Sequence, residues 1–426
     1  MRLDALDLSM ARKKIVNAFY AQSGGVTAVI NASAAGLIEA AHEHGIRVIA
    51  GHNGITGALN EELIDTSKET PSTIKMLAQT PGGIFGSCRY KLKNLADKRE
   101  EYEQLFKIFA AHEIRYFFYN GGGDSQDTTH KIAEISKTLG YPLTCVGIPK
   151  TIDNDLPFTD CCPGFGSAAK YLATSVREID YDLNSMAATS TKVFVLEVMG
   201  RHTGWLAAAT GLAREVAGDA PHIILFPEIP FDEEAFLNQV AENVRKHQRC
   251  VIVASEGIHT RDGTFLSDIG CLDAFGHTQL GGVAPMLAKL IKNRLHFKYH
   301  WAVADYLQRS ARHLASKVDL EQAYAVGRAA LLFALEGQHD VMASINRISD
   351  RPYRWEIVSV PLAEVANVEK PLPREYISPD GFHITPSCRE YLLPLISGEV
   401  PPSFKDGLPK FARLKRTFLP KRVLVN

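Results

Sequence analysis

Two short polar stretches of the sequence combine the residue types that phosphoryl transfer needs. Residues 147–155 read GIPKTIDND, and residues 120–125 read NGGGDS. The Lys150 side chain could hold a phosphoryl oxygen, while Asp153 and Asp155 could accept a proton or bind a metal ion. Bare glycine backbone lets N–H groups approach an anion closely, and the dipole of a following helix adds to the attraction. The alternative is that both stretches are polar turns of an ordinary α/β enzyme.

Both polar stretches follow runs that predict buried strands, residues 115–119 and 143–148. Ligands of open parallel α/β sheets bind beyond the carboxyl ends of the strands, where the loops between strands and helices gather. We therefore expect the two stretches to lie side by side. A helix is expected over 126–139, with Asp127 as an acid that suits the dipole of its first turn.

The start of the sequence predicts a β–α–β unit, which is typical of a parallel sheet. The predicted elements are a strand over 15–21, a helix over 27–44 and a strand over 47–50. The first strand ends at Ser23-Gly24-Gly25, but the glycines lack GxGxxG spacing and no acid follows the second strand. A dehydrogenase-type dinucleotide site is therefore weakly supported. Further along, a glycine-rich loop over 80–89 ends in Arg89, a candidate anion ligand or a solvated surface cation.

The alternation of strands and helices restarts after residues 155–165, a region rich in proline, glycine and cysteine that we interpret as a crossover between domains. The elements predicted beyond it are a helix over 168–181, strands over 192–199, 222–226 and 250–254, a helix over 283–293, a strand from 299 and a helix over 319–335. The last helix is expected to pack on the first domain. Residues 351–426 are rich in proline yet too apolar for disorder, which favours an extended arm around the core.

The composition excludes several classes of protein. The 426 residues suffice for two domains with sizeable cores, and 46% are hydrophobic and 22% charged. A net charge of −1 argues against a general nucleic-acid or anionic-membrane partner. No apolar run approaches the roughly 20 residues of a membrane-spanning helix, and residues 1–14 lack the apolar core of a signal peptide. Seven cysteines without a CxxC pair indicate reduced thiols in the cytoplasm.

Seven segments, in order along the chain, resemble the phosphofructokinase family, and most of all its pyrophosphate-dependent branch. They are residues 23–25, the loop ending at Arg89, residues 121–125, residues 149–155, Met199-Gly200-Arg201, Ser255-Glu256-Gly257 and Gln308-Arg309. Residues 366–371 (ANVEKP) also resemble that branch. The resemblance covers nearly the whole chain. It implies an α/β phosphofructokinase fold, with two Rossmann-like doubly wound domains facing a central cleft and an extended C-terminal arm.

The resemblance and the order of elements together divide the chain into three parts. We expect a phosphoryl-donor domain over 13–164, rejoined by about 308–367, then a sugar-phosphate domain over 165–307 and a C-terminal arm over 368–426 that packs on the core. Members of the family form homo-oligomers whose sites are completed across an interface. A homodimer is therefore expected, and Lys192 matches the basic residue that reaches a neighbouring subunit's site.

The resemblance also implies the reaction: reversible, magnesium-dependent transfer of a phosphoryl group from pyrophosphate to the 1-hydroxyl of fructose 6-phosphate, giving fructose 1,6-bisphosphate and phosphate. Asp153 matches the general base, and an acid beside a lysine and a metal ion is expected to stay ionised at pH 7. The catalytic set is Asp153 with Lys150, Thr151 and Arg201. The pyrophosphate-binding set is Gly25, Arg89, Gly122, Gly123, Asp124, Ser125 and Lys150. The substrate-binding set is Thr151, Asp153, Asp155, Lys192, Met199, Gly200, Arg201, Glu256, Tyr306 and Arg309, with Arg309 on the 6-phosphate.

Two positions decide the expected phosphoryl donor. In the ATP-dependent branch, glycines stand where this chain has Asp124 and Lys150, and they make room for the nucleotide. Here the two side chains fill that space and can pair with each other, so pyrophosphate is expected. The family usually has an acid where Gly123 stands, which leaves the metal ligand open between Asp124, the residue we favour, and Asp155.

Three alternatives remain for the sequence. The first two are an ATP-dependent phosphofructokinase and a sedoheptulose 7-phosphate kinase of the same fold. The third is a non-catalytic homologue that binds sugar phosphates, and the presence of Asp153, Arg201 and Arg309 argues against it.

Overall fold

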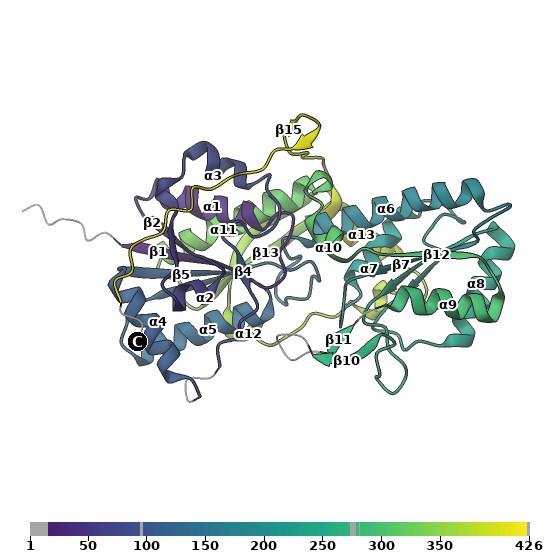
Figure 1. Ribbon diagram of the computed structural model, residues 1–426, viewed down its shortest axis with the longest axis horizontal. Coiled ribbons are helices and arrows are strands. Elements are labelled where there is room, and N and C mark those ends of the chain that lie inside the picture. Colours follow the sequence, from purple (N-terminus) through teal and green to yellow (C-terminus); the bar gives the residue numbers. More distant parts are fainter. Residues whose placement is uncertain (1–15, 94–96, 273–277, 281, 424–426) are drawn as a thin grey trace, which may run out of the picture.

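The structure, a computed structural model, describes residues 16–93, 97–272, 278–280 and 282–423. Residues 1–14, on which the expected absence of a signal peptide rests, and the first residue of the first predicted strand lie outside this range. Two α/β domains lie side by side in Figure 1, with the purple and blue N-terminal part of the chain on one side and teal segments on the other. Among the described residues, no helix combines the length and the apolar character needed to span a membrane.

A large sheet forms the centre of the first domain, in the strand order β14-β13-β6-β5-β1-β2-β3, with β4 also paired to β1. The edge pairs β13–β14 and β2–β3 are antiparallel and the others are parallel. Every residue of β1 is buried, because helices cover both faces of the sheet. The strands are β1 (Asn17–Ser23), β2 (Arg47–Gly51), β3 (Leu63–Asp65), β4 (Ser87–Cys88), β5 (Ile114–Gly121), β6 (Thr144–Pro149), β13 (Val341–Asp350) and β14 (Tyr353–Pro361).

Two layers of helices cover this sheet. The helices are α1 (Ile30–Glu43), α2 (Ile55–Leu59), α3 (Pro71–Leu77), α4 (Arg99–Ala111), α5 (Gly123–Thr138) and α11 (Lys317–Leu335). Helix α11 packs against α1, as expected from the sequence, and the contact needs glycine on both sides. A Cβ on Gly36 would lie 2.2 Å from the carbonyl oxygen of Tyr324, and one on Gly327 would lie 2.0 Å from that of Ser33. The two backbones therefore touch directly.

The second domain has a smaller parallel sheet in the order β12-β7-β9-β8. Its strands are β7 (Val193–Val198), β8 (Ile223–Leu225), β9 (Cys250–Ser255) and β12 (Tyr299–Val303), and a hairpin is formed by β10 (Asp268–Leu272) and β11 (Thr278–Leu280). Its helices are α6 (Phe165–Met186), α7 (Trp205–Thr210), α8 (Glu233–His247), α9 (Val283–Leu295) and α10 (Asp305–Ser310). One face of the sheet packs with α8 and α9, and the other shares the core that contains α6 and α7.

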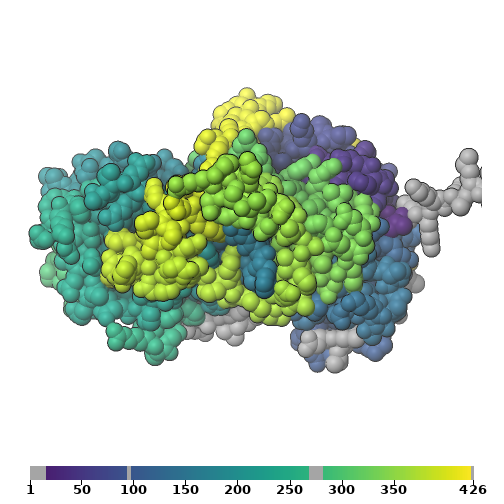
Figure 2. All heavy atoms as spheres, turned by 180° about the vertical axis from the view of Figure 1, so that it is seen from behind, coloured from purple at the N-terminus to yellow at the C-terminus, as the bar shows by residue number. Residues whose placement is uncertain are grey.

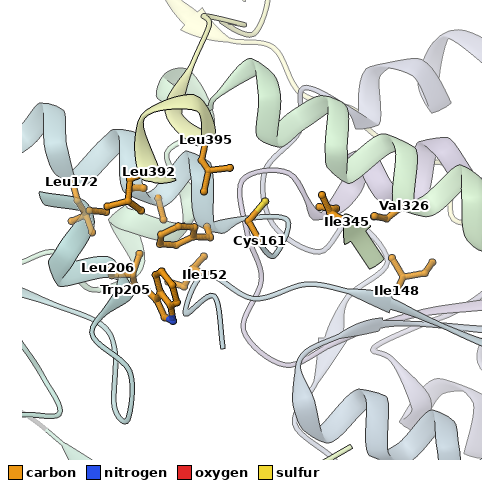
Figure 3. Packing of buried hydrophobic residues seen from close by; sticks show 14 of the residues in the cluster. Ile148, Ile152, Cys161, Leu172, Trp205, Leu206, Val326, Ile345, Leu392 and Leu395 are labelled. Atoms are coloured by element: carbon orange, nitrogen blue, oxygen red, sulfur yellow. The ribbon is translucent and has the colours of Figure 1, made fainter. Parts of the chain in front are cut away.

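One hydrophobic cluster runs across the junction of the two domains. Figure 3 shows Ile148 of β6 and Ile345 of β13 on the side of the first domain, and Trp205 of α7 on the side of the second. Leu392 of α13 (Pro386–Leu392) closes the cluster from the C-terminal part of the chain. The shared core fixes the floor of the space between the domains.

The chain after β14 runs back along both domains, as expected of an extended arm. It contains α12 (Leu362–Val365), α13 and the short strands β15 (Phe404–Lys405) and β16 (Leu408–Pro409). Figure 2 shows the lime and yellow C-terminal segments spread over both halves of one face. At its end the arm returns to the first sheet, where the Asp65 amide donates to the Thr417 carbonyl oxygen (2.9 Å).

Candidate active site

The carboxyl ends of the strands of both domains face one cleft of about 340 Å³. The cleft is lined by the loops after β1, β5 and β6, the loops after β7 and β9, and helix α10. All predicted site residues line it except Lys192 and Gly200. Parallel strands present their carboxyl ends at the same edge, which explains why residues so distant in the sequence meet here.

The glycine loop after β5 leads directly into a helix, so that Asp124 and Ser125 lie in the first turn of α5. The sequence predicts this helix from 126, but it begins at Gly123, and the Ser125 and Gln126 amides donate to the Gly122 carbonyl oxygen. The earlier start matters because the positive end of the helix dipole then points at the cleft.

Asp124 does not pair with Lys150, contrary to the sequence-based expectation. Its Oδ1 lies 2.7 Å from Nζ of Lys91, a residue that the sequence analysis did not single out. Nζ of Lys150 instead lies 3.4 Å from where a Cβ on Gly24 would be. Asp124 and Lys150, which the sequence places in one space, are therefore not paired with each other. The segment after β4 supplies Lys91 as the cation beside Asp124.

Lys150 is buried among other cations. Burial lowers the pKa of Lys150 to about 8, and Arg309 and Arg89 lower it further, while Asp153 and Asp155 oppose the change. A buried ammonium with neighbouring cations favours the binding of an anion, since the anion would relieve both costs.

Arg309 extends across the cleft from α10 toward the loop after β1. A Cβ on Gly25 would lie only 2.7 Å from a guanidinium nitrogen of Arg309, so a larger residue there would displace the arginine. The Arg309 guanidinium also stacks on the Tyr306 ring, with its carbon 3.8 Å from the ring centre. The arginine therefore joins the sugar-side helix to the donor-side loop.

Asp153 lines the cleft and is half-buried. Burial raises the pKa of Asp153 to about 7, and the carboxyls of Asp155 and Glu256 add to the rise, while Lys150 opposes it. The attraction to Lys150 alone does not offset the desolvation of Asp153, so its full ionisation at pH 7 stays a prediction that depends on the neighbouring metal ion. The Asp153 amide donates to Oγ1 of Thr151 (3.0 Å), which fixes the turn between the two.

Asp155 is the best placed of the acids to hold a cation. Burial raises the pKa of its carboxyl, and the Glu369 carboxylate adds to the rise. Its Oδ1 is buried and has no hydrogen-bond partner among the described residues. An orphaned carboxylate oxygen beside Asp153 fits Mg²⁺, which is usually held by one or two carboxylates together with substrate phosphates. The predicted ligand Asp124 has one oxygen already engaged by Lys91.

The sugar-side loop depends on one glycine and one acid. Gly200 has a positive φ of 129°, and a Cβ there would lie 2.5 Å from the Thr203 carbonyl oxygen. The Gly200 amide donates to Oε1 of Glu256 (3.3 Å), and burial raises the pKa of Glu256. Gly200 thus shapes the loop that places Met199 in the cleft without lining the cleft itself.

Lys192 takes no part in the cleft of its own chain. It precedes β7, at the amino end of the strand, and its Nζ donates to the carbonyl oxygen of Ala187. The cleft lies beyond the carboxyl end of the same strand, so one strand length separates the two. A role of Lys192 in a partner's site stays a prediction.

Seven lining residues were absent from the predicted set: Ser23, Gly24, Val26, Ile152, His202, Thr203 and Glu369. His202 and Thr203 directly follow Arg201, so their position in the sequence was an available signal. Glu369 belongs to the C-terminal segment, and no local pattern places it in the cleft. It arrives there through tertiary packing, since the Lys370 amide donates to the Asp155 carbonyl oxygen (2.7 Å).

The sequence pattern of one family, described as Phosphofructokinase, matches residues 17–333. The chain belongs to the phosphofructokinase family. The match begins at the first residue of β1 and ends within α11, so it includes all the loops that line the cleft except the C-terminal segment that carries Glu369.

Proteins similar to this phosphofructokinase share nearly its whole length. The pyrophosphate--fructose 6-phosphate 1-phosphotransferase of Halomonas elongata is 62% identical over 403 residues, covering 94% of this chain and 96% of that protein. The protein of the same name from Methylococcus capsulatus is 60% identical over 413 residues, covering 96% and 98%. A crystal structure of a pyrophosphate-dependent phosphofructokinase from Marinobacter aquaeolei is 57% identical, with a TM-score of 0.89, covering 96% of this chain and 99% of that one. The predicted family and α/β fold are confirmed.

Proposed function

We propose that this phosphofructokinase transfers a phosphoryl group reversibly from pyrophosphate to the 1-hydroxyl of fructose 6-phosphate, giving fructose 1,6-bisphosphate and phosphate. The observation that carries the proposal is the filled donor end of the cleft, where Lys150 is buried beside Gly24 and Asp124 is paired with Lys91. A small polyanion meets cations there, whereas a nucleotide would meet side chains. The names of the similar proteins support the same reaction.

The chemistry assigned to the cleft needs a base, an electrostatic clamp and correct positioning. Asp153 would accept the proton of the 1-hydroxyl, since its pKa near 7 suits a general base at neutral pH. Lys150 and Arg89, with the amino end of α5, would neutralise the pyrophosphate oxygens. Arg201 lines the opposite wall, where it would balance charge on the transferred group. Thr151 would orient that group beside the base.

Magnesium is part of the proposal. Asp155, with its orphaned buried oxygen, would hold the ion, and Asp153 lies two residues away in the same loop. When bound, the ion would neutralise charge on the phosphoryl oxygens. A cation at this place would also lower the pKa of both carboxyls and return Asp153 toward the ionised form that a base requires.

Arg309 and Glu256 are proposed for the sugar phosphate. Arg309 provides a planar fork suited to phosphate oxygens, and Glu256 would accept hydrogen bonds from sugar hydroxyls.

We also propose that the donor domain spans 13–164 with about 308–367, that the sugar-phosphate domain spans 165–307, and that 368–426 form the arm. Support comes from the sheets, because β13 pairs with β6 in the first sheet although it follows the second domain in sequence.

A homodimer in the cytoplasm completes the proposal. The edge strand β12 exposes Trp301 and Val303, which are 46% and 40% accessible, and offers unpaired backbone to a second copy. Six cysteines, Cys88, Cys145, Cys161, Cys162, Cys250 and Cys388, are free thiols, in keeping with a reducing compartment. Light scattering of the purified chain tests the dimer.

A coupled assay with fructose 6-phosphate and magnesium, offering pyrophosphate or ATP, tests the function. Turnover with pyrophosphate alone is expected. Turnover with ATP alone would show that the donor end is open after all and would overturn the proposed donor. No turnover with either would overturn the proposed substrates.

A further inference from the structure

Lys91 stands out because it contacts a residue of the site but has no role in the proposed reaction. It lies two residues after Arg89, in the segment that follows β4. Its Nζ lies 2.7 Å from Oδ1 of Asp124, a contact that raises the pKa of Lys91. The side chains of Lys91 and Asp124 are 46% and 32% accessible, so the pair is partly exposed at the edge of the cleft.

The segment that carries Lys91 is anchored on both sides. Leu92 is fully buried in the core under the first sheet. The hydroxyl of Tyr90 donates to Glu101 of α4 (2.8 Å), and that of Tyr102 donates to the carbonyl oxygen of Lys93 (2.7 Å). The ammonium of Lys91 is therefore presented from a fixed backbone rather than from a loose loop.

Asp124 needs such a partner if the cleft binds an anionic donor. Its carboxylate lines the cleft at the first turn of α5, in the neighbourhood where the phosphate oxygens would bind. An unpaired carboxylate there would repel the donor, and it would also be free to change rotamer. The next acid of the helix, Asp127, has its own partners in Lys131 (2.7 Å) and Asn367 (2.9 Å). Lys91 provides the contact that compensates the charge of Asp124.

The space beside the pair is otherwise open. A Cβ on Gly123 would meet nothing within 4 Å, so the loop itself offers no bulk that could exclude a longer donor. Exclusion at this end therefore depends on where the Asp124 side chain is held.

We propose that Lys91 is a specificity-determining residue, which positions and neutralises Asp124 so that the cleft accepts inorganic pyrophosphate and excludes donors that extend beyond two phosphates. This inference rests on the proposed function, since it assumes a pyrophosphate donor. Lys91 acts through Asp124 and is a positioning residue rather than one that touches the reacting atoms.

The test compares Lys91→Met, Lys91→Arg and Lys137→Met with the unaltered enzyme. Lys137 is the matched control, because its pair with Glu134 (2.7 Å) also has an exposed lysine, 56% accessible, but lies outside the cleft. For Lys91→Met we expect the KM for pyrophosphate to rise about tenfold. We also expect the inhibition constant of ATP, measured in competition with pyrophosphate, to fall about tenfold. The KM for fructose 6-phosphate should stay within about twofold, and Lys91→Arg should restore both values.

A double-mutant cycle with Asp124→Asn separates positioning from direct contact. If Lys91 acts through Asp124, Lys91→Met should change the KM for pyrophosphate less than about twofold in the Asp124→Asn background. An equal effect in both backgrounds would mean that Lys91 binds the donor itself, and would overturn the inference. Unchanged kinetics in Lys91→Met would overturn it too. Failure of the unaltered enzyme to use pyrophosphate would overturn the proposed function instead, and the inference with it.

Discussion

Nδ1 of His202 lies 3.1 Å from each carboxylate oxygen of Glu369, and this pair joins the sugar-side loop of the second domain to the C-terminal segment. The backbone of the adjoining residue Lys370 makes hydrogen bonds to both domains. Its amide donates to the Asp155 carbonyl oxygen, and its carbonyl accepts from Nε1 of Trp205 (3.0 Å). The segment thus forms one wall of the site and connects it to the core.

This pair predicts a pH-dependent stability. The hydrogen bond to Glu369 raises the pKa of His202. Because the folded-state pKa exceeds the ordinary value of about 6.5, the pair stabilises fully below that value and loses its effect as the pH rises through the raised pKa. His202→Gln should therefore cost about 0.5 kcal/mol at about pH 6 and nothing at about pH 9 in urea unfolding. An equal cost at both would instead assign the effect to the stacking of His202 on Phe265.

The role of Asp153 predicts a loss of turnover with a gain of stability. Asp153→Asn should lower kcat by about 10²- to 10⁴-fold, because an amide cannot accept the proton of the 1-hydroxyl. The raised pKa of a buried acid also means that its ionisation opposes folding above about pH 4. The variant should therefore be more stable at about pH 8, by on the order of 2 kcal/mol. Asp406→Asn, at an exposed turn, is the control, and a destabilised Asp153→Asn would contradict the electrostatic account.

The proposed magnesium ligand predicts a difference between two acids. Asp155→Asn should raise the magnesium concentration for half-maximal activity about tenfold or more, because it removes a buried anionic oxygen. Asp124→Asn should change it little, since Lys91 already engages that carboxylate. Magnesium titration at fixed pyrophosphate measures both. The opposite order would restore the sequence-based choice of Asp124.

The donor end predicts a change of substrate. Asp124→Gly combined with Lys150→Gly should lower kcat/KM for pyrophosphate by at least about 100-fold and allow measurable turnover with ATP. In the unaltered enzyme, the KM for pyrophosphate should rise as the pH passes about 8, where Lys150 loses its proton. A double variant that binds neither donor would mean that the two side chains support the loop rather than filter the donor.

The contact between α1 and α11 predicts a stability difference between two glycines. Gly36→Ala places a methyl group 2.2 Å from the Tyr324 carbonyl oxygen and should cost more than about 3 kcal/mol. Gly140→Ala meets nothing within 4 Å, but its φ of 64° makes it cost about 1 kcal/mol. Urea unfolding of both variants checks the order, and equal costs would show that the helices can move apart.

The sequence by itself, with its resemblance to a family, determined the fold class and most of the residues that line the cleft. Strand periodicity and the glycine and acid patterns at strand ends are local, and parallel sheets bring such ends together in a predictable way. The tertiary structure decided the partners. Lys91 rather than Lys150 pairs with Asp124, because that depends on the path of the chain after β4.

The burial of the site residues could not be predicted from the sequence either. The ionisation of Asp153 depends on how many carboxyls share its cleft and how little water reaches it, and both are set by the packing of two domains. Glu369 enters the cleft from a segment far along the chain, held by hydrogen bonds of its neighbour Lys370. Periodicity reports on local faces, whereas such contacts arise only when distant segments are brought together in the folded chain.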